Sequence, residues 1–79
     1  MVTILHRQRY GYDVVIYTSE HGPAHVHVFR GGKQLKAELL PIRIVDNGGF
    51  NNRETRRIRA LLEEHHTLLL HEWTRLHGE

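Results

Sequence analysis

Hydrophobic and polar residues alternate along the first half of the chain, which is the pattern of half-buried β-strands. In an extended segment His25 and His27 fall on one side, and Val26 and Val28 fall on the other. β-branched and aromatic residues mark four such segments, at 2–7, 12–18, 25–29 and 34–40. Residues 42–45 form a short extension of the fourth segment. The pattern predicts an antiparallel sheet of three or four strands in meander order, over about residues 2–45.

Gly31 and Gly32 separate two of these segments and favour a two-residue hairpin loop, because glycine adopts the positive φ angles of a type I′ turn. With Arg30 opposite Lys33, the next pairs are Val28 with Leu35, His27 with Lys36, Val26 with Ala37, and His25 with Glu38. One face of this hairpin is apolar, and we call the other the histidine face: His25, His27, Lys36 and Glu38. A slip of one residue would destroy this sorting, so the pattern supports the register.

Apolar residues in the second half recur at steps of three, four and seven, which is typical of an amphipathic helix. They are Ile58, Leu61, Leu62, Leu69, Trp73 and Leu76. Asn51 followed by Glu54 fits an N-cap with a capping box, and Gly78 suits the C-terminal cap. We predict one long helix over about residues 52–77 that packs on the apolar face of the hairpin. This α+β arrangement leaves the histidine face open.

A chain of 79 residues forms one domain, here 1–79, and a domain this small buries only about 60% of the surface that its unfolded chain exposes. Without cysteine it has no disulfide or thiolate–zinc site, so a partner chain or a homodimer is a candidate source of stability. Leu70 points away from the predicted stripe and fits such a dimer. His65 falls inside the stripe, where a hydrogen-bonded core or interface histidine is favoured over a ligand. No signal-peptide pattern or membrane-length apolar run is present, so we expect a cytoplasmic protein with no membrane partner.

The formal net charge of +2 is modest, but arginine is concentrated in one short segment. This segment contains Arg53, Arg56, Arg57 and Arg59. Arginine suits phosphate recognition better than lysine does, so the segment is a candidate nucleic-acid-binding surface. The alternative is that these arginines form a solvent-exposed helix face that has no role in binding. Phe29, expected on the histidine face, is a further candidate contact for a base.

The histidine face offers the residue types for metal-independent, ribonuclease-like cleavage of RNA. One of the two imidazoles, His25 or His27, takes a proton from a 2′-hydroxyl while the other gives one to the leaving oxygen. Lys36 stabilises the developing phosphorane charge, and Glu38 orients His25. Glu20 completes this candidate catalytic site, which needs no cofactor.

A His-x-His pair on a strand also presents two imidazoles to one metal ion, with His21 or Glu20 from the preceding loop as a third ligand. The alternative site therefore consists of His21, His25 and His27 around a transition metal such as zinc. A third interpretation is a solvated sheet face whose histidines make ordinary cross-strand pairs, worth about 0.2 to 1 kcal/mol each.

The stretch Glu20-His21-Gly22-Pro23-Ala24-His25-Val26-His27-Val28 resembles the motif E-H-x-P-P-H-V-H-V of a family of small bacterial and archaeal proteins classed as a domain of unknown function. The resemblance continues through Val2-Thr3-Ile4, Gly11-Tyr12, Lys36-Ala37, Gly49-Phe50 and Trp73. Ala24 departs from it, because the family has a second proline at that position.

Members of that family often sit in two-gene modules beside another small protein, so the resemblance implies a component of a toxin–antitoxin pair. The resemblance implies that the motif residues are functional: Glu20, His21, Pro23, His25 and His27, with Lys36 as a further candidate. It implies no particular reaction. We therefore expect a component that binds a small partner protein encoded nearby and RNA through the histidine face. The alternatives are a metal-binding protein and a non-catalytic homodimeric interaction module.

Overall fold

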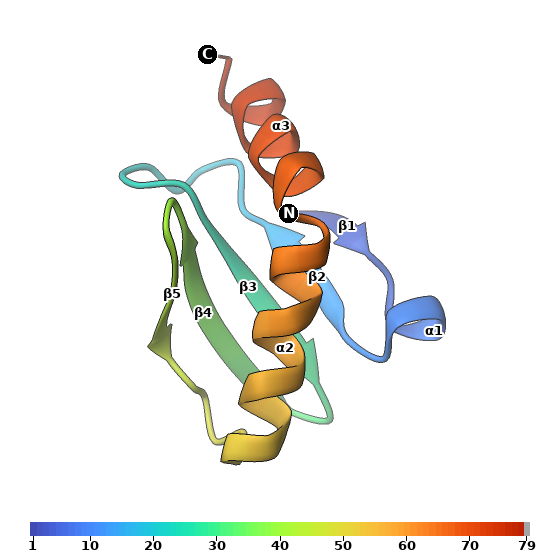
Figure 1. The fold of residues 1–79 in the computed structure, drawn as a ribbon. Helices are drawn as coiled ribbons and strands as arrows, with labels where there is room; N and C mark the ends of the chain where they lie inside the picture. Colours follow the sequence, from blue (N-terminus) through green and yellow to red (C-terminus); the bar gives the residue numbers. More distant parts are fainter. Residues whose placement is uncertain (79) are drawn as a thin grey trace.

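The computed structural model describes residues 1–78, and within that range the chain forms an antiparallel sheet followed by two C-terminal helices (Figure 1). The elements are β1 (Val2–Leu5), α1 (Arg7–Tyr10), β2 (Asp13–Ile16), β3 (His25–Arg30), β4 (Lys33–Leu39), β5 (Ile42–Asp46), α2 (Asn52–Glu64) and α3 (His66–His77). The strands lie in the order β1-β2-β3-β4-β5, and each neighbouring pair is antiparallel. The predicted α+β class and meander order are confirmed, and the described sheet has five strands.

The hairpin of β3 and β4 has the register that its two glycines predict. Gly31 and Gly32 have φ angles of 55° and 82°, which glycine adopts without a Cβ clash. The pairs are Arg30 with Lys33, Val28 with Leu35, His27 with Lys36, Val26 with Ala37, and His25 with Glu38. His25 and His27 therefore share one face of the sheet.

The opposite face of the sheet forms the main core. Its fully buried side chains from β2, β3 and β4 are Val14, Ile16, Val26, Val28, Leu35, Ala37 and Leu39. The helices contribute Ile58, Leu62, Leu69 and Trp73 to the same cluster. In Figure 1 α2 lies across this face of the sheet and α3 continues beyond the end of the sheet, so the predicted packing on the apolar face is confirmed for α2.

Several strand boundaries differ from the sequence prediction by one or two residues, and β2, for example, spans Asp13–Ile16 and not 12–18. The first strand ends at Leu5 and not at residue 7, because the Asp13 carboxylate accepts a hydrogen bond from the backbone N–H of Arg7, where α1 begins. The short extension after Pro41 is a complete edge strand, β5, in which Ile44 pairs with Ala37 of β4.

The predicted long helix is interrupted at His65. This residue has φ −108° and ψ 20°, outside the helical region, and its ring meets the edge of Tyr10. Just after the break, the ring of His66 donates a hydrogen bond to the carbonyl oxygen of Leu39 and ties α3 to the end of β4. Leu70 packs partly buried against the core, so the prediction that it points away from the packed face is wrong.

The ends of the helical region lie where the sequence places them. The side chain of Asn51 accepts a hydrogen bond of 2.8 Å from the backbone N–H of Glu54, and Gly78 ends α3 with φ 73°. No helix within residues 1–78 combines the length and the apolar character needed to cross a membrane.

Candidate functional site

The carboxylate of Glu20 contacts both histidines of the predicted site. Its Oε1 atom lies 2.6 Å from Nε2 of His25 and 2.9 Å from Nε2 of His27. The two rings project from the same face of β3 with their centroids 5.4 Å apart, and Glu20 reaches them from the loop between β2 and β3. One donor atom from each residue lies within 4.8 Å of the other two. We call these three residues the Glu20 cluster.

The two histidine rings are enclosed. His25 is 5% exposed and His27 is 6% exposed, so the prediction that they lie on an open face is wrong. The reason is the loop of residues 17–24, which folds back over this face and leaves the Glu20 side chain 41% exposed at its surface. Val15, the partner of His27 on β2, is buried beside them. The sheet therefore has a second, smaller buried layer on the side opposite α2.

Aromatic rings flank the cluster on both sides. The ring of Tyr17 meets His27 edge-on at 4.8 Å between centroids, and the indole of Trp73 lies 4.9 Å from the His25 ring. His77 stacks on the other side of Trp73 at 3.7 Å. These contacts hold the imidazoles in one orientation and keep water from their faces.

His77 also fixes the backbone of the loop that carries Glu20. Its Nε2 atom lies 2.9 Å from the carbonyl oxygen of Glu20, and its Nδ1 atom lies 2.8 Å from the carbonyl oxygen of Trp73. The last turn of α3 therefore anchors the loop, so the position of the Glu20 carboxylate depends on the C-terminal helix.

The hydrogen bonds of His25 determine where its protons lie. Nδ1 is 2.9 Å from the carbonyl oxygen of Pro23, which only accepts hydrogen bonds, so Nδ1 carries a hydrogen. In the neutral ring, Nε2 then has only a lone pair, and this lone pair faces the carboxylate of Glu20 at 2.6 Å. Two lone pairs at that distance repel each other. A proton must therefore lie between the two atoms, because a separation of 2.6 Å is too short for a metal ion bonded to both.

His27 can adopt either tautomer, because its second partner is an amide. Nε2 of Gln34 donates to Nδ1 of His27 over 2.9 Å, which leaves the Nε2 hydrogen of His27 for Glu20. Rotation of the Gln34 amide by half a turn presents its oxygen to a protonated Nδ1 and frees the Nε2 lone pair. The ring can therefore direct either a hydrogen or a lone pair at Glu20 without flipping.

The environment favours the ionised carboxylate at Glu20. The hydrogen bond from His25, and then the one from His27, hold the pKa of Glu20 below its usual value of 4.5, against a smaller opposing effect of burial. Glu20 is thus available as an anionic ligand or acceptor at neutral pH.

Lys36 and Glu38 occupy their predicted positions on the histidine face. Lys36 lies opposite His27 and is half-buried. The carboxylate of Glu38 pairs with Arg43 at 3.1 Å. The prediction that Glu38 orients His25 is wrong, because both ring nitrogens of that histidine already contact Pro23 and Glu20.

His21 lies outside the cluster. It is exposed, and its ring centroid is 6.3 Å from that of His77. Among residues 1–78, the group that can share one ion consists of Glu20, His25 and His27. Of the two loop residues that the sequence offers as a third ligand, the structure therefore brings Glu20 to the histidines.

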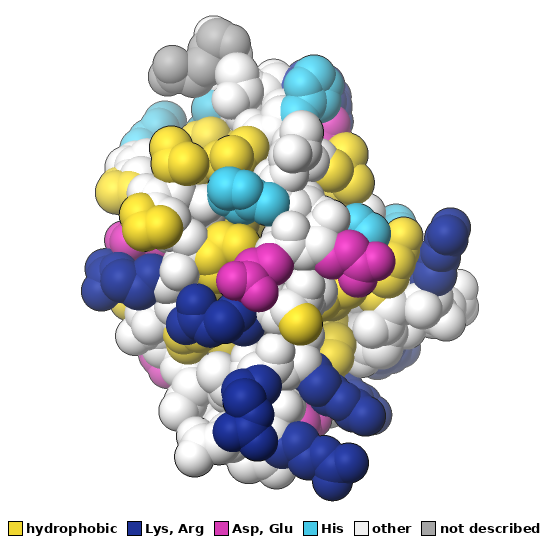
Figure 2. Space-filling view, in the orientation of Figure 1, with side chains coloured by type: hydrophobic (Ala, Val, Ile, Leu, Met, Phe, Trp, Pro, Cys, Tyr) yellow, Lys and Arg dark blue, Asp and Glu magenta, His cyan; other side chains and the backbone are white. Residues whose placement is uncertain are grey.

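The predicted arginine surface lies on a different part of the molecule. Three of its four members are exposed on α2: Arg53, Arg56 and Arg57. Arg59 is half-buried and donates to the carbonyl oxygen of Ile42 over 3.3 Å. Figure 2 shows Lys and Arg side chains mainly in the lower half, where α2 begins, and histidines mainly in the upper half. Phe29 is half-buried on the histidine face, between Asp13 and Gln34.

Sequence reasoning missed the residues that support the cluster: Tyr17, Gln34, Trp73 and His77. Gln34 pairs with Phe29 and reaches His27 diagonally across the hairpin, so the predicted register contains the signal for it. The contacts of Trp73 and His77 depend on the break at His65, for which the helical pattern gives no signal.

No curated protein and no solved structure matches this chain significantly. A family model described as a domain of unknown function, DUF4160, matches residues 11–74, most of the chain. The matched span contains Glu20, His25, His27 and Trp73. The chain therefore belongs to the DUF4160 family, in agreement with the family assignment that the motif predicts.

Proposed function

We propose that this protein binds a divalent transition metal ion, such as zinc, through Glu20, His25 and His27. The observation that carries the proposal is the contact between Nδ1 of His25 and the carbonyl oxygen of Pro23, at 2.9 Å. A metal-ligating histidine ordinarily donates its other ring N–H to a carbonyl or carboxylate, which fixes the tautomer and directs the lone pair at the ion. His25 is arranged in this way, because its other ring nitrogen, Nε2, faces the anionic carboxylate of Glu20 at 2.6 Å.

The donor set suits such an ion. Two imidazole nitrogens and one carboxylate oxygen are found at zinc and at non-haem iron centres that keep open positions for water or substrate. Tetrahedral zinc, with bonds of about 2.0 to 2.2 Å, separates its ligand atoms by about 3.3 Å. Glu20 now lies 2.6 Å and 2.9 Å from the two nitrogens, and the three donor atoms lie within 4.8 Å of one another, so binding requires the carboxylate to move outward and the two imidazoles to approach each other. Glu20 is on a loop and 41% exposed, which permits that movement.

The test is a metal titration with a matched histidine control. Protein purified without a histidine tag is freed of metal with a chelator, and zinc binding is then measured by calorimetry and by elemental analysis after desalting. We expect one ion per chain in the unmodified protein and in His71→Gln, which changes an exposed histidine on α3. We expect none in Glu20→Gln or His27→Gln. Equal loss in His71→Gln, or no saturable binding by the unmodified chain, would overturn the proposal and leave a proton between His25 and Glu20.

A second candidate function is RNA binding within a two-gene toxin–antitoxin module, together with a small partner protein encoded nearby. The exposed arginines of α2 support it, because guanidinium groups pair with phosphates in bidentate geometry. RNA cleavage by His25 and His27 requires a change in the structure, because every ring nitrogen of the pair already has a partner and neither ring is open to solvent. The loop that carries Glu20 must open before either imidazole can reach a 2′-hydroxyl.

The RNA candidate is tested by fluorescence polarisation with a short single-stranded RNA. Arg53→Gln/Arg56→Gln is compared with Arg7→Gln/Arg9→Gln, which removes the same charge from exposed positions on α1. We expect the α2 variant to bind about tenfold more weakly, with a smaller dependence of affinity on salt. Equal losses in both variants would indicate attraction by net charge alone and would remove this candidate. Co-expression with the product of the adjacent gene tests the module directly.

A further inference from the structure

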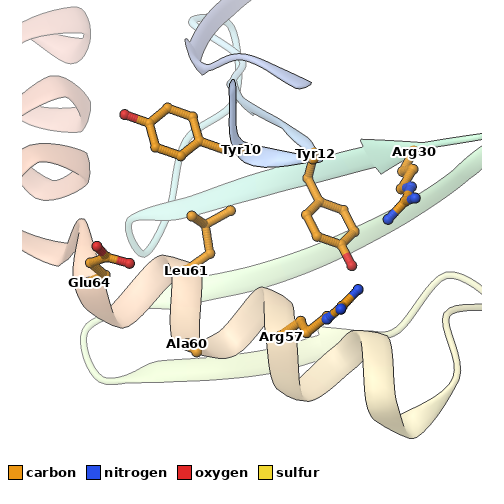
Figure 3. Close-up of a pocket in the computed structure, with 8 residues that line it drawn as sticks. Tyr10, Tyr12, Arg30, Arg57, Ala60, Leu61 and Glu64 are labelled. Atoms are coloured by element: carbon orange, nitrogen blue, oxygen red, sulfur yellow. The ribbon is translucent and has the colours of Figure 1, made fainter. Parts of the chain in front are cut away.

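A pocket of about 340 Å³ lies at the opposite end of β3 from His25. It is bounded by α2 on one side and by the connection from α1 to β2 on the other (Figure 3). The lining includes Tyr10, Tyr12, Arg30, Arg57, Leu61 and Glu64. Its volume falls within the range of small-ligand sites, about 300 to 1,000 Å³. None of these residues belongs to the Glu20 cluster.

The hydroxyl group of Tyr12 is buried at this pocket without a hydrogen-bond partner in the described chain. Tyr12 is only 4% exposed, and its ring packs against Phe50 in the core. Figure 3 shows the hydroxyl directed toward α2 and the side chain of Arg57. A buried hydroxyl that lacks a partner is costly, and an explanation is needed for each one in a folded protein. A ligand oxygen at this position supplies the missing partner.

Two guanidinium groups lie at the same end of the pocket. That of Arg30 lies over the Tyr12 ring at 5.3 Å from its centroid, and Arg57 projects from α2 below it (Figure 3). The carboxylate that competes for Arg30 is that of Glu54, at 3.9 Å, which is long for a hydrogen-bonded ion pair. Two guanidinium groups and one hydroxyl donor form a cradle for an anion with several oxygens.

The other end of the pocket is different in character. There the ring of Tyr10 and the side chain of Leu61 form apolar walls, and Glu64 supplies a carboxylate (Figure 3). These walls suit a planar ring, and the carboxylate accepts hydrogen bonds from an amino or hydroxyl group on it. The pocket thus has an anion-binding end and an aromatic end.

From this arrangement we propose that the pocket binds a nucleoside that carries a phosphate monoester on its sugar, that is, a nucleoside monophosphate or the 5′-phosphorylated end of an RNA strand. Arg30 and Arg57 hold the phosphate, and the Tyr12 hydroxyl donates a hydrogen bond to one of its oxygens. The base lies between Tyr10 and Leu61, with Glu64 at its polar edge. The site is separate from the metal-binding proposal and does not depend on it.

The test is calorimetric titration of the full chain with adenosine monophosphate, adenosine and a 5′-phosphorylated trinucleotide. We expect adenosine to bind at least about tenfold more weakly than its monophosphate, because it lacks the charge-assisted bonds to the two arginines. Monophosphate binding with no binding of the trinucleotide identifies a free nucleotide as the ligand. Comparable binding of both identifies the RNA end. Adenosine binding as tightly as its monophosphate, or no binding of either phosphorylated probe, would overturn the proposal.

Three variants tie the binding to this pocket. Arg57→Gln removes one arginine, whereas Arg75→Gln removes the same charge from an exposed position on α3 outside the pocket. We expect about tenfold weaker binding in the first and less than about twofold change in the second. Tyr12→Phe keeps the buried ring and removes only the hydroxyl, with an expected loss of about fivefold. Equal losses in Arg75→Gln and Arg57→Gln contradict the proposal, and circular dichroism confirms that each variant is folded.

Discussion

Nε2 of His25 lies 2.6 Å from Oε1 of Glu20. Because the other nitrogen of that ring already donates to a carbonyl oxygen, the contact needs a cation between its two atoms. In the apo protein this cation is a proton, and we propose that a metal ion replaces it. The other supporting contacts of the cluster serve to hold this pair in place.

The Glu20 contact predicts a pH-dependent contribution to stability. The two histidines lower the pKa of Glu20, so its ionised form stabilises the fold above the unfolded value of about 4.5, and this contribution is lost as the pH falls through the lower folded value. After a discount for the exposure of the side chain, we expect metal-free Glu20→Gln to be about 1 kcal/mol less stable at pH 7. Urea denaturation at pH 7 and pH 3 measures the difference. A gap that persists unchanged at pH 3 would contradict the assignment.

Trp73 is the single tryptophan of the chain and lies 4.9 Å from the His25 ring, so its fluorescence reports on the cluster. We expect zinc to change the emission intensity of the metal-free protein with saturation at one equivalent, because the charge and protonation of the neighbouring imidazole change. The same titration of Glu20→Gln should leave the emission unchanged. An identical response in both proteins would place the metal elsewhere.

Gln34 hydrogen-bonds Nδ1 of His27 and holds the orientation of its ring, so its replacement should weaken metal binding without unfolding the protein. Gln34 is exposed, and Gln34→Ala removes only its hydrogen bond of 2.9 Å to Nδ1. Loss of a residue that orients a metal ligand typically lowers metal affinity about 10- to 100-fold. Calorimetry with zinc measures the affinity, and a thermal melt checks the fold. An unchanged affinity would show that Gln34 has no part in the site.

The backbone at Gly48 leaves no room for a side chain, so we expect substitution there to lower the stability of the fold independently of the Glu20 cluster. Its φ is +61°, and a Cβ at this position would lie 1.6 Å from the backbone oxygen of Gln34, so the chain must shift in Gly48→Ala. Gly49→Ala has the same kind of φ strain, but its Cβ would meet only a side-chain atom of Lys33, at 4.0 Å. We expect a loss above about 2 kcal/mol in the first and about 1 kcal/mol in the second, by urea denaturation. The reverse order would contradict this packing.

The sequence predicts the hairpin fully and the site only in part, for physical reasons. The register of β3 and β4 follows from local rules, namely two glycines in the turn and a strict alternation of apolar side chains. The burial of His25 and His27 follows from a loop and from the last turns of α3, which approach the histidines only in the folded chain. Periodicity assigns faces to a strand, but it does not show what covers each face.

The position of the third ligand illustrates the same limit. Glu20 and His21 are neighbours in a loop, and their spacing from His25 does not distinguish between them. In the folded chain His77 holds the carbonyl oxygen of Glu20 from 57 residues away, while the Glu20 side chain contacts the two histidines. Such a contact between distant segments has no local signature in the sequence.

The most direct test of the cation between His25 and Glu20 is nitrogen NMR of the imidazole rings during zinc titration. We predict that Nδ1 of His25 stays protonated throughout, that the Nε2 signals of His25 and His27 change in step with one equivalent of zinc, and that the exposed His71 does not respond. Imidazole signals of His25 and His27 that stay unchanged while zinc is added in excess would contradict the metal site.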